Sequence, residues 1–257
     1  TGTPTSYTIT VNPTPTVNTV ANQAVCNGSN TTAVTFSGAV TGTVYSWTNN
    51  TPSIGLAASG TGDIASFTAV NTGTTPVVAT ITVTPSANGC SGTPRTFTIT
   101  VNPTPTVNAV SNQVICNGSN TTAVAFSGAV TGTVYSWTNN TTSIGLAASG
   151  TGNIASFAAV NTGTTPVTAT ITVTPSYTNG GVTCTGTPTS FTITVNPTPT
   201  VNVVANQVLC NGSSTTAVTF TGAVAGTVYN WTNTTTSIGL AASGTGNIAS
   251  FVAVNAG

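Results

Sequence analysis

The octapeptide VNPTPTVN occurs three times in the chain, beginning at Val11, Val101 and Val195. When the copies are aligned, residues 1–83 and residues 91–173 differ at only 13 positions, and residues 185–257 continue the same pattern. Self-similarity at a nearly fixed period indicates that each repeat is one structural module. A unit of about 90 residues has the size of one small domain, so we expect an array of such domains.

Alternation of apolar residues with threonine is the clearest local pattern within a repeat. The run TFTITV places Phe97, Ile99 and Val101 on one face, and residues 77–85 and 33–38 alternate in the same way. A period of two predicts strands. Segments rich in Gly, Asn and Pro, such as ASGTGNIAS, separate these runs and indicate turns. We therefore predict an all-β chain of tandem immunoglobulin-like sandwiches, each with about seven short strands.

The copies of the octapeptide also predict the domain limits. Residues 1–14 match the last strand and linker of a repeat, so we assign them to a preceding one. Complete repeats are then expected at 15–104 and 105–198, which we call repeat one and repeat two. Residues 199–257, called repeat three, are read as incomplete because AVNAG stands where the earlier copies continue into another strand.

Proline is expected to make the connections between repeats stiff. It fixes its own φ and disfavours the helical conformation in the residue before it, so NPTP should be a short, extended connector. Strands of about 8 to 10 residues, rising about 3.3 Å per residue, predict a rod with a pitch of roughly 35 to 45 Å per repeat. The linker prolines are Pro13, Pro15, Pro103, Pro105, Pro197 and Pro199.

A tyrosine and a tryptophan lie two residues apart in each repeat, on the same face of a predicted strand. Such a pair could form a sugar-stacking platform. A bulky tryptophan in this place more commonly fills the centre of an immunoglobulin-like sandwich, and we predict that core role. The residues are Tyr45, Trp47, Tyr135, Trp137, Tyr229 and Trp231.

Charge is nearly absent, which excludes several classes of function. Arg95 and Asp63 are the only charged side chains, and the chain has no His or Lys. It offers no basic surface for nucleic acid, no acidic cluster for a metal ion and no basic face for a membrane. A nucleophile would lack a base, and Asp63 is replaced by Asn153 and Asn247 in the other copies. We predict no enzyme, no cofactor, no metal site and no membrane-inserted segment.

A set of motifs recurs in the same order in the repeats: VCNGS, YxW, IGLAASGTG, ATITVTP, a Cys-containing loop and FTITVNP. This pattern resembles the PKD-like, immunoglobulin-like repeats of very large surface adhesins that gliding Bacteroidota export through the type IX secretion system. The resemblance implies an extracellular, cell-surface stalk or filament that serves attachment or gliding motility. Many PKD domains carry W-x-F-G-D-G after their tryptophan. Here WTNNTPSIG stands instead, without the acidic residue.

The cysteines recur at two places in the repeat, before NGS and in the loop that precedes the last strand. Metal binding would need closely spaced pairs, which the sequence lacks. Disulfides in an extracellular setting are the better interpretation. The NGS sequences also match the acceptor motif for N-glycosylation, which is common by chance in a chain rich in Asn and Ser. The cysteines are Cys26, Cys90, Cys116, Cys184 and Cys210.

Two disulfide pairings remain open. Sequence order pairs Cys26 with Cys90, and Cys116 with Cys184, inside each repeat. If Cys26 ends the first strand, however, it lies about 30 Å from the last hairpin, whereas a disulfide needs Cα atoms within about 7 Å. Head-to-tail packing would instead join Cys26 to Cys184, leave Cys90 and Cys210 to further repeats, and leave Cys116 to the unfinished end of repeat three. The distance between the two ends of one sandwich favours this second pairing.

Near-identical repeats favour a structural stalk, since a spacer needs only length. Its expected partners are neighbouring repeats of the same chain or of like chains, and surface glycans are a further candidate. One alternative is an adhesin module that binds glycan or ice through threonine-rich faces. Another is a filament subunit that lends its N-terminal strand to a neighbour, because residues 1–10 are an orphan strand and repeat three is incomplete.

Overall fold

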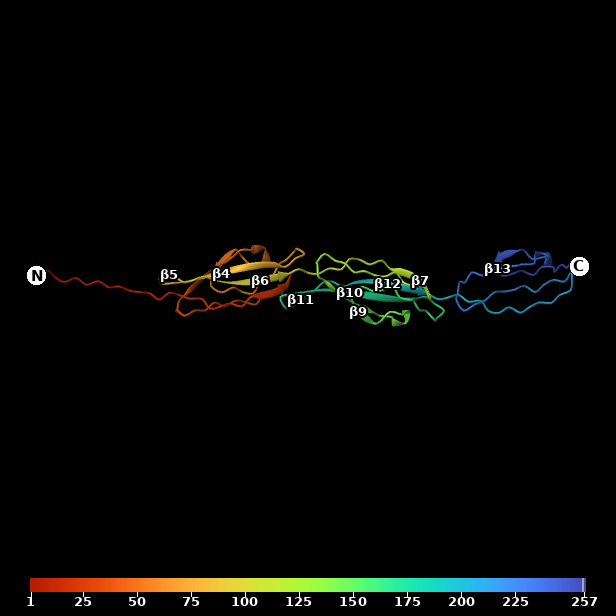
Figure 1. Ribbon diagram of the computed structural model, residues 1–257, viewed down its shortest axis with the longest axis horizontal. Helices are drawn as coiled ribbons and strands as arrows, with labels where there is room; N and C mark the ends of the chain where they lie inside the picture. Colours follow the sequence, from red (N-terminus) through yellow and green to blue (C-terminus); the bar gives the residue numbers. More distant parts are fainter. Residues whose placement is uncertain (256) are drawn as a thin grey trace.

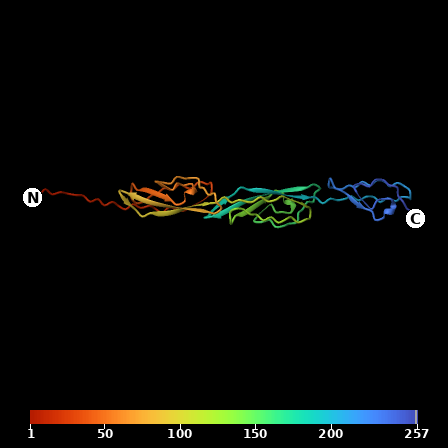
Figure 2. The ribbon, with the colours of Figure 1, turned by 90° about the horizontal axis from the view of Figure 1, so that it is seen from above.

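The computed structural model describes residues 1–255 and residue 257, and its regular structure is almost entirely β. The three repeats follow one another along the longest axis of the picture (Figure 1), and a second view agrees (Figure 2). Single helical turns, all 3-10, interrupt the β structure once in each repeat: η1 (Pro52–Ile54), η2 (Thr142–Ile144) and η3 (Thr236–Ile238).

Repeat one contains a six-stranded sheet. Its strands are β1 (Gln23–Cys26), β2 (Val44–Asn49), β3 (Ser59–Thr61), β4 (Val77–Ala87), β5 (Cys90–Ser91) and β6 (Arg95–Asn102). They lie in the order β1-β6-β4-β2-β3, and β5 forms a short hairpin with β4. β1 is parallel to β6, so that Cys26 lies beside Asn102, and the other neighbours are antiparallel. Both Cys26 and Asn102 therefore lie at the end of the sheet that points toward repeat two.

The second layer of the sandwich is held by few backbone pairs. Isolated antiparallel bridges join Asn30 to Thr68 and Val34 to Ile64. The predicted strand at residues 33–38 is therefore wrong beyond its bridge at Val34. The ladder stops because the backbone N–H of Phe36 donates to Oδ1 of Asp63, at 2.9 Å, rather than to a neighbouring strand.

Repeat two reproduces this arrangement, whereas repeat three contains only a two-stranded sheet among its described residues. The sheet of repeat two has the order β7-β12-β10-β8-β9, with β11 paired to β10. Its strands are β7 (Gln113–Cys116), β8 (Val134–Asn139), β9 (Ser149–Thr151), β10 (Val167–Asn179), β11 (Val182–Thr185) and β12 (Thr189–Asn196). Repeat three has β13 (Asn230–Thr232) and β14 (Ser243–Thr245).

Each complete repeat has its own hydrophobic core, as the alternation of β4 and β6 predicts. Ile81 and Val101 are fully buried, and Trp47 is 7% exposed. The indole of Trp47 covers Gly60, where an added Cβ would overlap the ring. The expectation of a turn throughout ASGTG is therefore partly wrong: residues 59–61 form β3, and the turn begins at Gly62, whose φ is 73°. In repeat two, Trp137 is 8% exposed and lies in the equivalent core.

Candidate functional site: the junction between repeats

A disulfide and two side-chain hydrogen bonds between asparagines join distant parts of the chain where repeat one meets repeat two. The hairpin of β10 and β11 turns at Gly180 and Gly181, whose φ angles are 60° and 76°. Glycine suits these positions because other residues rarely adopt positive φ. The hairpin reaches repeat one, where a Cβ added to Gly180 would lie 3.0 Å from Cβ of Ala24. Figure 1 shows β11 at the end of repeat two that faces repeat one.

A disulfide joins Cys26 of β1 to Cys184 of β11. Their Cα atoms are 5.5 Å apart, although 158 positions separate them in the sequence. Cys184 is 2% exposed. The structure thus links a cysteine at the far end of repeat one to the near end of repeat two, which is the pairing between repeats and not the pairing within them.

Two asparagines add a polar contact beside the disulfide. Nδ2 of Asn102 donates to the backbone oxygen of Asn179 at 3.0 Å, and Nδ2 of Asn179 donates to Oδ1 of Asn102 at 2.9 Å. Asn102 is fully buried, so its amide depends on these partners in place of water. The two hydrogen bonds fix the tip of the hairpin against the end of β6.

The asparagine of the first NGS sequence also contributes to this end of repeat one. Asn27 donates its backbone N–H to the oxygen of Asn102 at 2.9 Å, and its Nδ2 donates to Oγ1 of Thr104 at 3.0 Å. Its Oδ1 accepts the backbone N–H of Asn71 at 2.9 Å. The atom to which an N-linked glycan would be attached is therefore already engaged with the linker.

Four of the six linker prolines are buried against protein rather than suspended between domains. Pro103 and Pro105 are buried, and Pro15, the counterpart of Pro105, is almost completely buried. A Cβ on Gly186 would overlap the backbone oxygen of Pro105, so the linker runs directly over the segment that follows β11. The second proline of the octapeptide thus belongs structurally to the repeat that follows it. Pro13 and Pro199 are exposed, whereas Pro197 is buried.

The N-terminal segment contacts the near end of repeat one in the same way that the end of β6 contacts the near end of repeat two. Nδ2 of Asn12, which precedes Asn102 by one repeat, donates to the backbone oxygen of Asn88 at 3.0 Å. Asn88 and Gly89 form the tip of the β4–β5 hairpin, with φ angles of 48° and 79°. Ahead of this contact the segment forms no described strand, and Tyr7 is 85% exposed.

The other cysteines are free in the structure. Cys116 is exposed at the position equivalent to Cys26, and Cys90 is half-buried at the position equivalent to Cys184. Cys210, the third residue of the Cys26 type, is exposed. The pairing of Cys90 and Cys210 with further repeats, and of Cys116 with the unfinished end of repeat three, stays a prediction.

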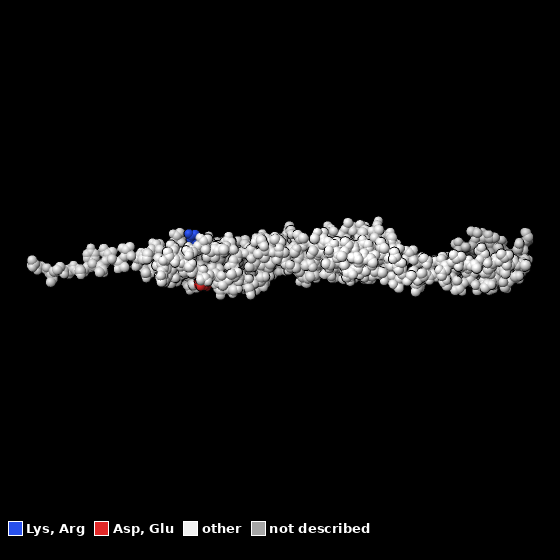
Figure 3. Space-filling view, turned by 90° about the horizontal axis from the view of Figure 1, so that it is seen from below, with Lys and Arg blue, Asp and Glu red and all other residues white. Residues whose placement is uncertain are grey.

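The charged residues have ordinary structural contacts. Asp63 accepts the N–H of Phe36, and Asn153 does the same for Phe126 through its Oδ1, also at 2.9 Å. Nη1 of Arg95 donates to Oγ1 of Thr19 at 3.1 Å. Figure 3 shows one blue and one red patch on an otherwise uncharged face. Among the described residues, no three His, Cys, Asp or Glu side chains gather as a metal site would require, and no helix is long and apolar enough to cross a membrane.

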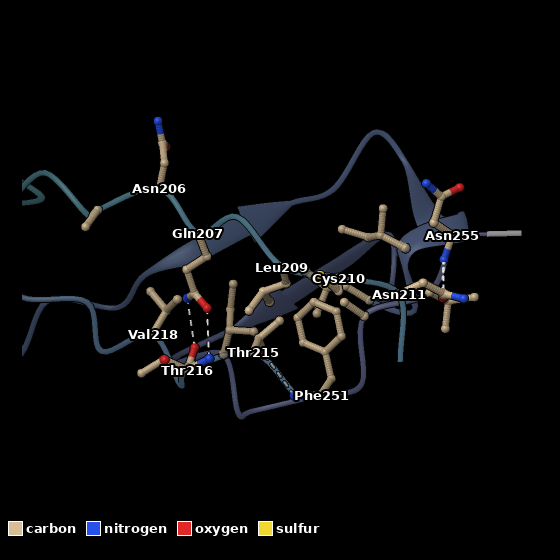
Figure 4. Close-up of a pocket in the computed structure, with 16 residues that line it drawn as sticks. Asn206, Gln207, Leu209, Cys210, Asn211, Thr215, Thr216, Val218, Phe251 and Asn255 are labelled. Atoms are coloured by element: carbon tan, nitrogen blue, oxygen red, sulfur yellow. Dashed lines mark hydrogen bonds between the residues drawn. The ribbon is translucent and has the colours of Figure 1, made fainter. Parts of the chain in front are cut away.

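Repeat three exposes the face that the other repeats bury. A groove of about 450 Å³ opens beside residues 205–211 and is shown in Figure 4. Ile238 lines it and is 38% exposed, whereas its counterpart Ile144 in repeat two is completely buried. In repeats one and two the corresponding face is covered by β4 and β6, or by β10 and β12.

Comparison with known proteins bears mainly on repeat one. Residues 23–105 match the family model of the PKD-like domain. The match covers the sheet of repeat one. Repeat two, which differs from it at few positions, has the same strand order. No curated protein matches the chain.

Solved structures of tandem Ig or cadherin domains align weakly. The DIP-gamma Ig1 and Ig2 domains share 8% identity over 72% of this chain and 98% of theirs, with a TM-score of 0.38. Cadherin domains 1–4 of protocadherin gamma B7 share 9% identity over 94% and 68%, with a TM-score of 0.34. The N-terminal eight Ig domains of DSCAM share 13% over 94% and 38%, with a TM-score of 0.36. Likenesses this weak say nothing about partners.

Sequence reasoning identified the cysteines and core aromatics as candidate structural residues, but it missed Asn102 and Asn179. Both had a local signal. Asn102 precedes the first proline of the octapeptide, and Asn179 begins an Asn-Gly pair, which is a strong hairpin signal. The sequence did not show that Asn102 and Asn179 contact each other.

Proposed function

We propose that this chain is a segment of a structural stalk in an extracellular adhesin, in which successive sandwiches are fixed head to tail as a rod. The observation that carries this proposal is the junction, where the Cys26–Cys184 disulfide and the Asn102–Asn179 pair join two repeats. A flexible string of binding domains has no need of covalent and polar attachment at its boundary. A spacer that must keep its length does.

The extracellular, cell-surface location and the role in attachment or gliding motility belong to the same proposal. A disulfide supports an oxidising compartment. The resemblance to gliding adhesins supports the type IX export route. No side chain in the described residues suggests catalysis, so the proposed role is mechanical, and no cofactor is invoked.

The proposal is tested by the shape of the isolated chain. Small-angle X-ray scattering should give a maximum dimension that grows by roughly 35 to 45 Å for each complete repeat added, as strand length requires. Chains with one and two complete repeats provide the comparison. A dimension that grows much more slowly, as in a chain with freely rotating domains, contradicts the rod.

A second candidate function rests on the outer face of the sheet, where β10 and β12 present rows of threonine. Such rows could bind neutral glycans or ice. Oγ1 of Thr168 and Oγ1 of Thr194 are 2.9 Å apart, and Oγ1 of Thr172 and Oγ of Ser190 are 3.0 Å apart. These hydroxyls already bond one another, which favours a structural role. Binding of an isolated repeat to a glycan array would favour the alternative.

The groove of repeat three bears on the alternative of a strand-donating subunit. Residues 5–12 read TSYTITVN and match β12, TSFTITVN, at all positions but one. A second copy could therefore add this segment to the groove by β-augmentation. The mass of the native material distinguishes the two: one very long polypeptide supports the stalk, and a ladder of subunits near 25 kDa supports strand donation.

A further inference from the structure

The cysteines divide each repeat into a short segment and a long one, and the short segment has a constant length. Cys116 follows Cys90 by 26 residues, and Cys210 follows Cys184 by 26 residues. The octapeptides, in contrast, are separated by 90 residues in one case and 94 in the other. The additional residues lie in the hairpin of β10 and β11, outside the 26-residue segment.

The 26-residue segments are extended throughout. From Cys184 to Cys210 the chain passes through the end of β11, through β12 and through the proline linker, and it contains no helix and no turn. The same is true from Cys90 to Cys116. An extended chain of 26 residues spans at most about 86 to 94 Å, close to the length of two repeats at the pitch expected from their strands. Such a segment is already close to its fully extended length.

We propose that the Cys26–Cys184 disulfide joins residues 1–26 to the segment from Cys184 to Cys210 as a covalent track that carries tension past most of the folded repeats. Tension applied at the ends of the chain passes along the first 26 residues, crosses the disulfide to Cys184 and leaves through β12. Residues 27–183 lie in the loop that the disulfide closes. Most core residues of repeats one and two lie within that loop and bear no stretching force through their backbone, whereas Phe191, Ile193 and Val195 of β12 lie on the track itself.

Cys116 and Cys210 lie at the position of Cys26, and Cys90 lies at the position of Cys184, so the same geometry repeats along an array. Each disulfide would bypass two folded bodies, and the 26-residue segment that follows it would lead to the next disulfide on the same track. The inference rests on the proposed stalk function, because only a stalk under tension makes use of such a track.

Single-molecule force spectroscopy tests the track directly. The chain is held by peptide tags at its two ends, with C90S, C116S and C210S to prevent exchange, and it is pulled before and after treatment with a phosphine reductant that converts the disulfide to two thiols. With the disulfide closed, residues 27–183 release no length. After reduction, they release roughly 520 to 570 Å in addition, because 158 residue steps separate the two cysteines. The C26S/C184S variant should release this length without reductant.

A matched pair of insertions separates shielding from a general change in stability. Twenty Gly-Ser residues inserted between Thr41 and Gly42, in an exposed turn inside the loop, should add about 66 to 72 Å only after reduction. The same insertion after Gly2, outside the loop, should add this length in both states. Equal release from the oxidised and reduced chains, or added length from the Thr41 insertion while the disulfide is closed, overturns the track.

The outcomes distinguish the track from the stalk function. If the closed disulfide prevents the release of residues 27–183 but the maximum dimension from scattering does not grow with repeat number, the rod is refuted and the track is supported. Full unravelling of the oxidised chain together with normal rod dimensions refutes the track and leaves the stalk standing.

Discussion

Asn102 and Asn179 belong to different repeats and are 77 positions apart, yet each donates its side-chain amide to the other residue across the junction. Asn102 has no exposed surface, whereas its counterpart Asn12 is half-buried and donates to Asn88. The same sequence position thus has two environments in one molecule. This difference provides a controlled test of what the asparagine pair contributes.

Asn102→Ala should lower the free energy of unfolding by about 1–3 kcal/mol. Two hydrogen bonds are lost, and the half-buried Nδ2 of Asn179 is left without its acceptor. Hydrogen exchange at residues 179–182 should rise in the same variant. Asn12→Ala is the control and should change stability by less than about 0.5 kcal/mol, because it removes one solvent-exposed hydrogen bond and leaves no buried group without a partner. Equal effects of the two substitutions would contradict the structural role assigned to the junction.

Gly60→Ala should destabilise repeat one by about 1–3 kcal/mol or more, because the added methyl group has no space beneath the indole of Trp47. Denaturant-dependent hydrogen exchange read by mass spectrometry resolves repeat one from repeat two in the same molecule. Ser59→Ala, at the exposed neighbouring position, is the control and should have little effect. A fully tolerated Gly60→Ala would mean that the tryptophan does not lie on this glycine in solution.

Asp63→Asn should be almost neutral, within about 0.5 kcal/mol, because the amide oxygen of Asn153 already accepts the equivalent bond from Phe126. Asp63→Ala should cost about 1–3 kcal/mol, because the N–H of the buried Phe36 loses its acceptor. Urea denaturation measures both. A large loss with Asn would show that the carboxylate charge itself matters.

The alternating strands were predictable because their side chains respond to a single requirement, that one face be apolar. β4 and β6 follow this rule almost residue by residue, and the predicted all-β fold is confirmed. Residues 33–38 alternate in the same way, but a side chain, Asp63, takes the hydrogen bond that would have continued the ladder. Periodicity reports which face is buried and does not report what the backbone N–H groups bond.

The junction was only partly predictable, for a related reason. The position of Cys26 at the end of a strand and of Cys90 in a hairpin follows from turn signals, and strand length then separates these two residues. The contact of Asn102 with Asn179 depends on how one domain is placed against the next. That placement is determined by the whole surface of the hairpin, including Gly180 against Ala24, and no local pattern encodes it.

Association of this chain with itself or with a surface should depend little on sodium chloride, because one Arg and one Asp provide almost nothing to screen. Retention on a surface coated with the same chain should stay nearly constant between about 0.01 and 1 M ionic strength. A variant with S46K and T48K, which adds two cations to exposed positions of β2, should gain a salt dependence and serves as the control. A steep dependence in the unaltered chain would contradict association through its uncharged faces.

Replacing Pro103 and Pro105 with Gly should loosen the angle between repeats one and two, because proline restricts both its own φ and the residue before it. The disulfide and the asparagine pair also hold this angle, so the effect should be clearest when all five cysteines are changed to Ser. In that chain, spin labels on S46C and S136C, two equivalent exposed positions, report the distance between the repeats. The distance distribution should broaden with the double glycine variant and should not change with P52T, which removes an exposed proline at a position where repeat two has Thr142. An unchanged distribution in the glycine variant would show that packing against the hairpin alone, without proline stiffness, sets the angle between the two repeats.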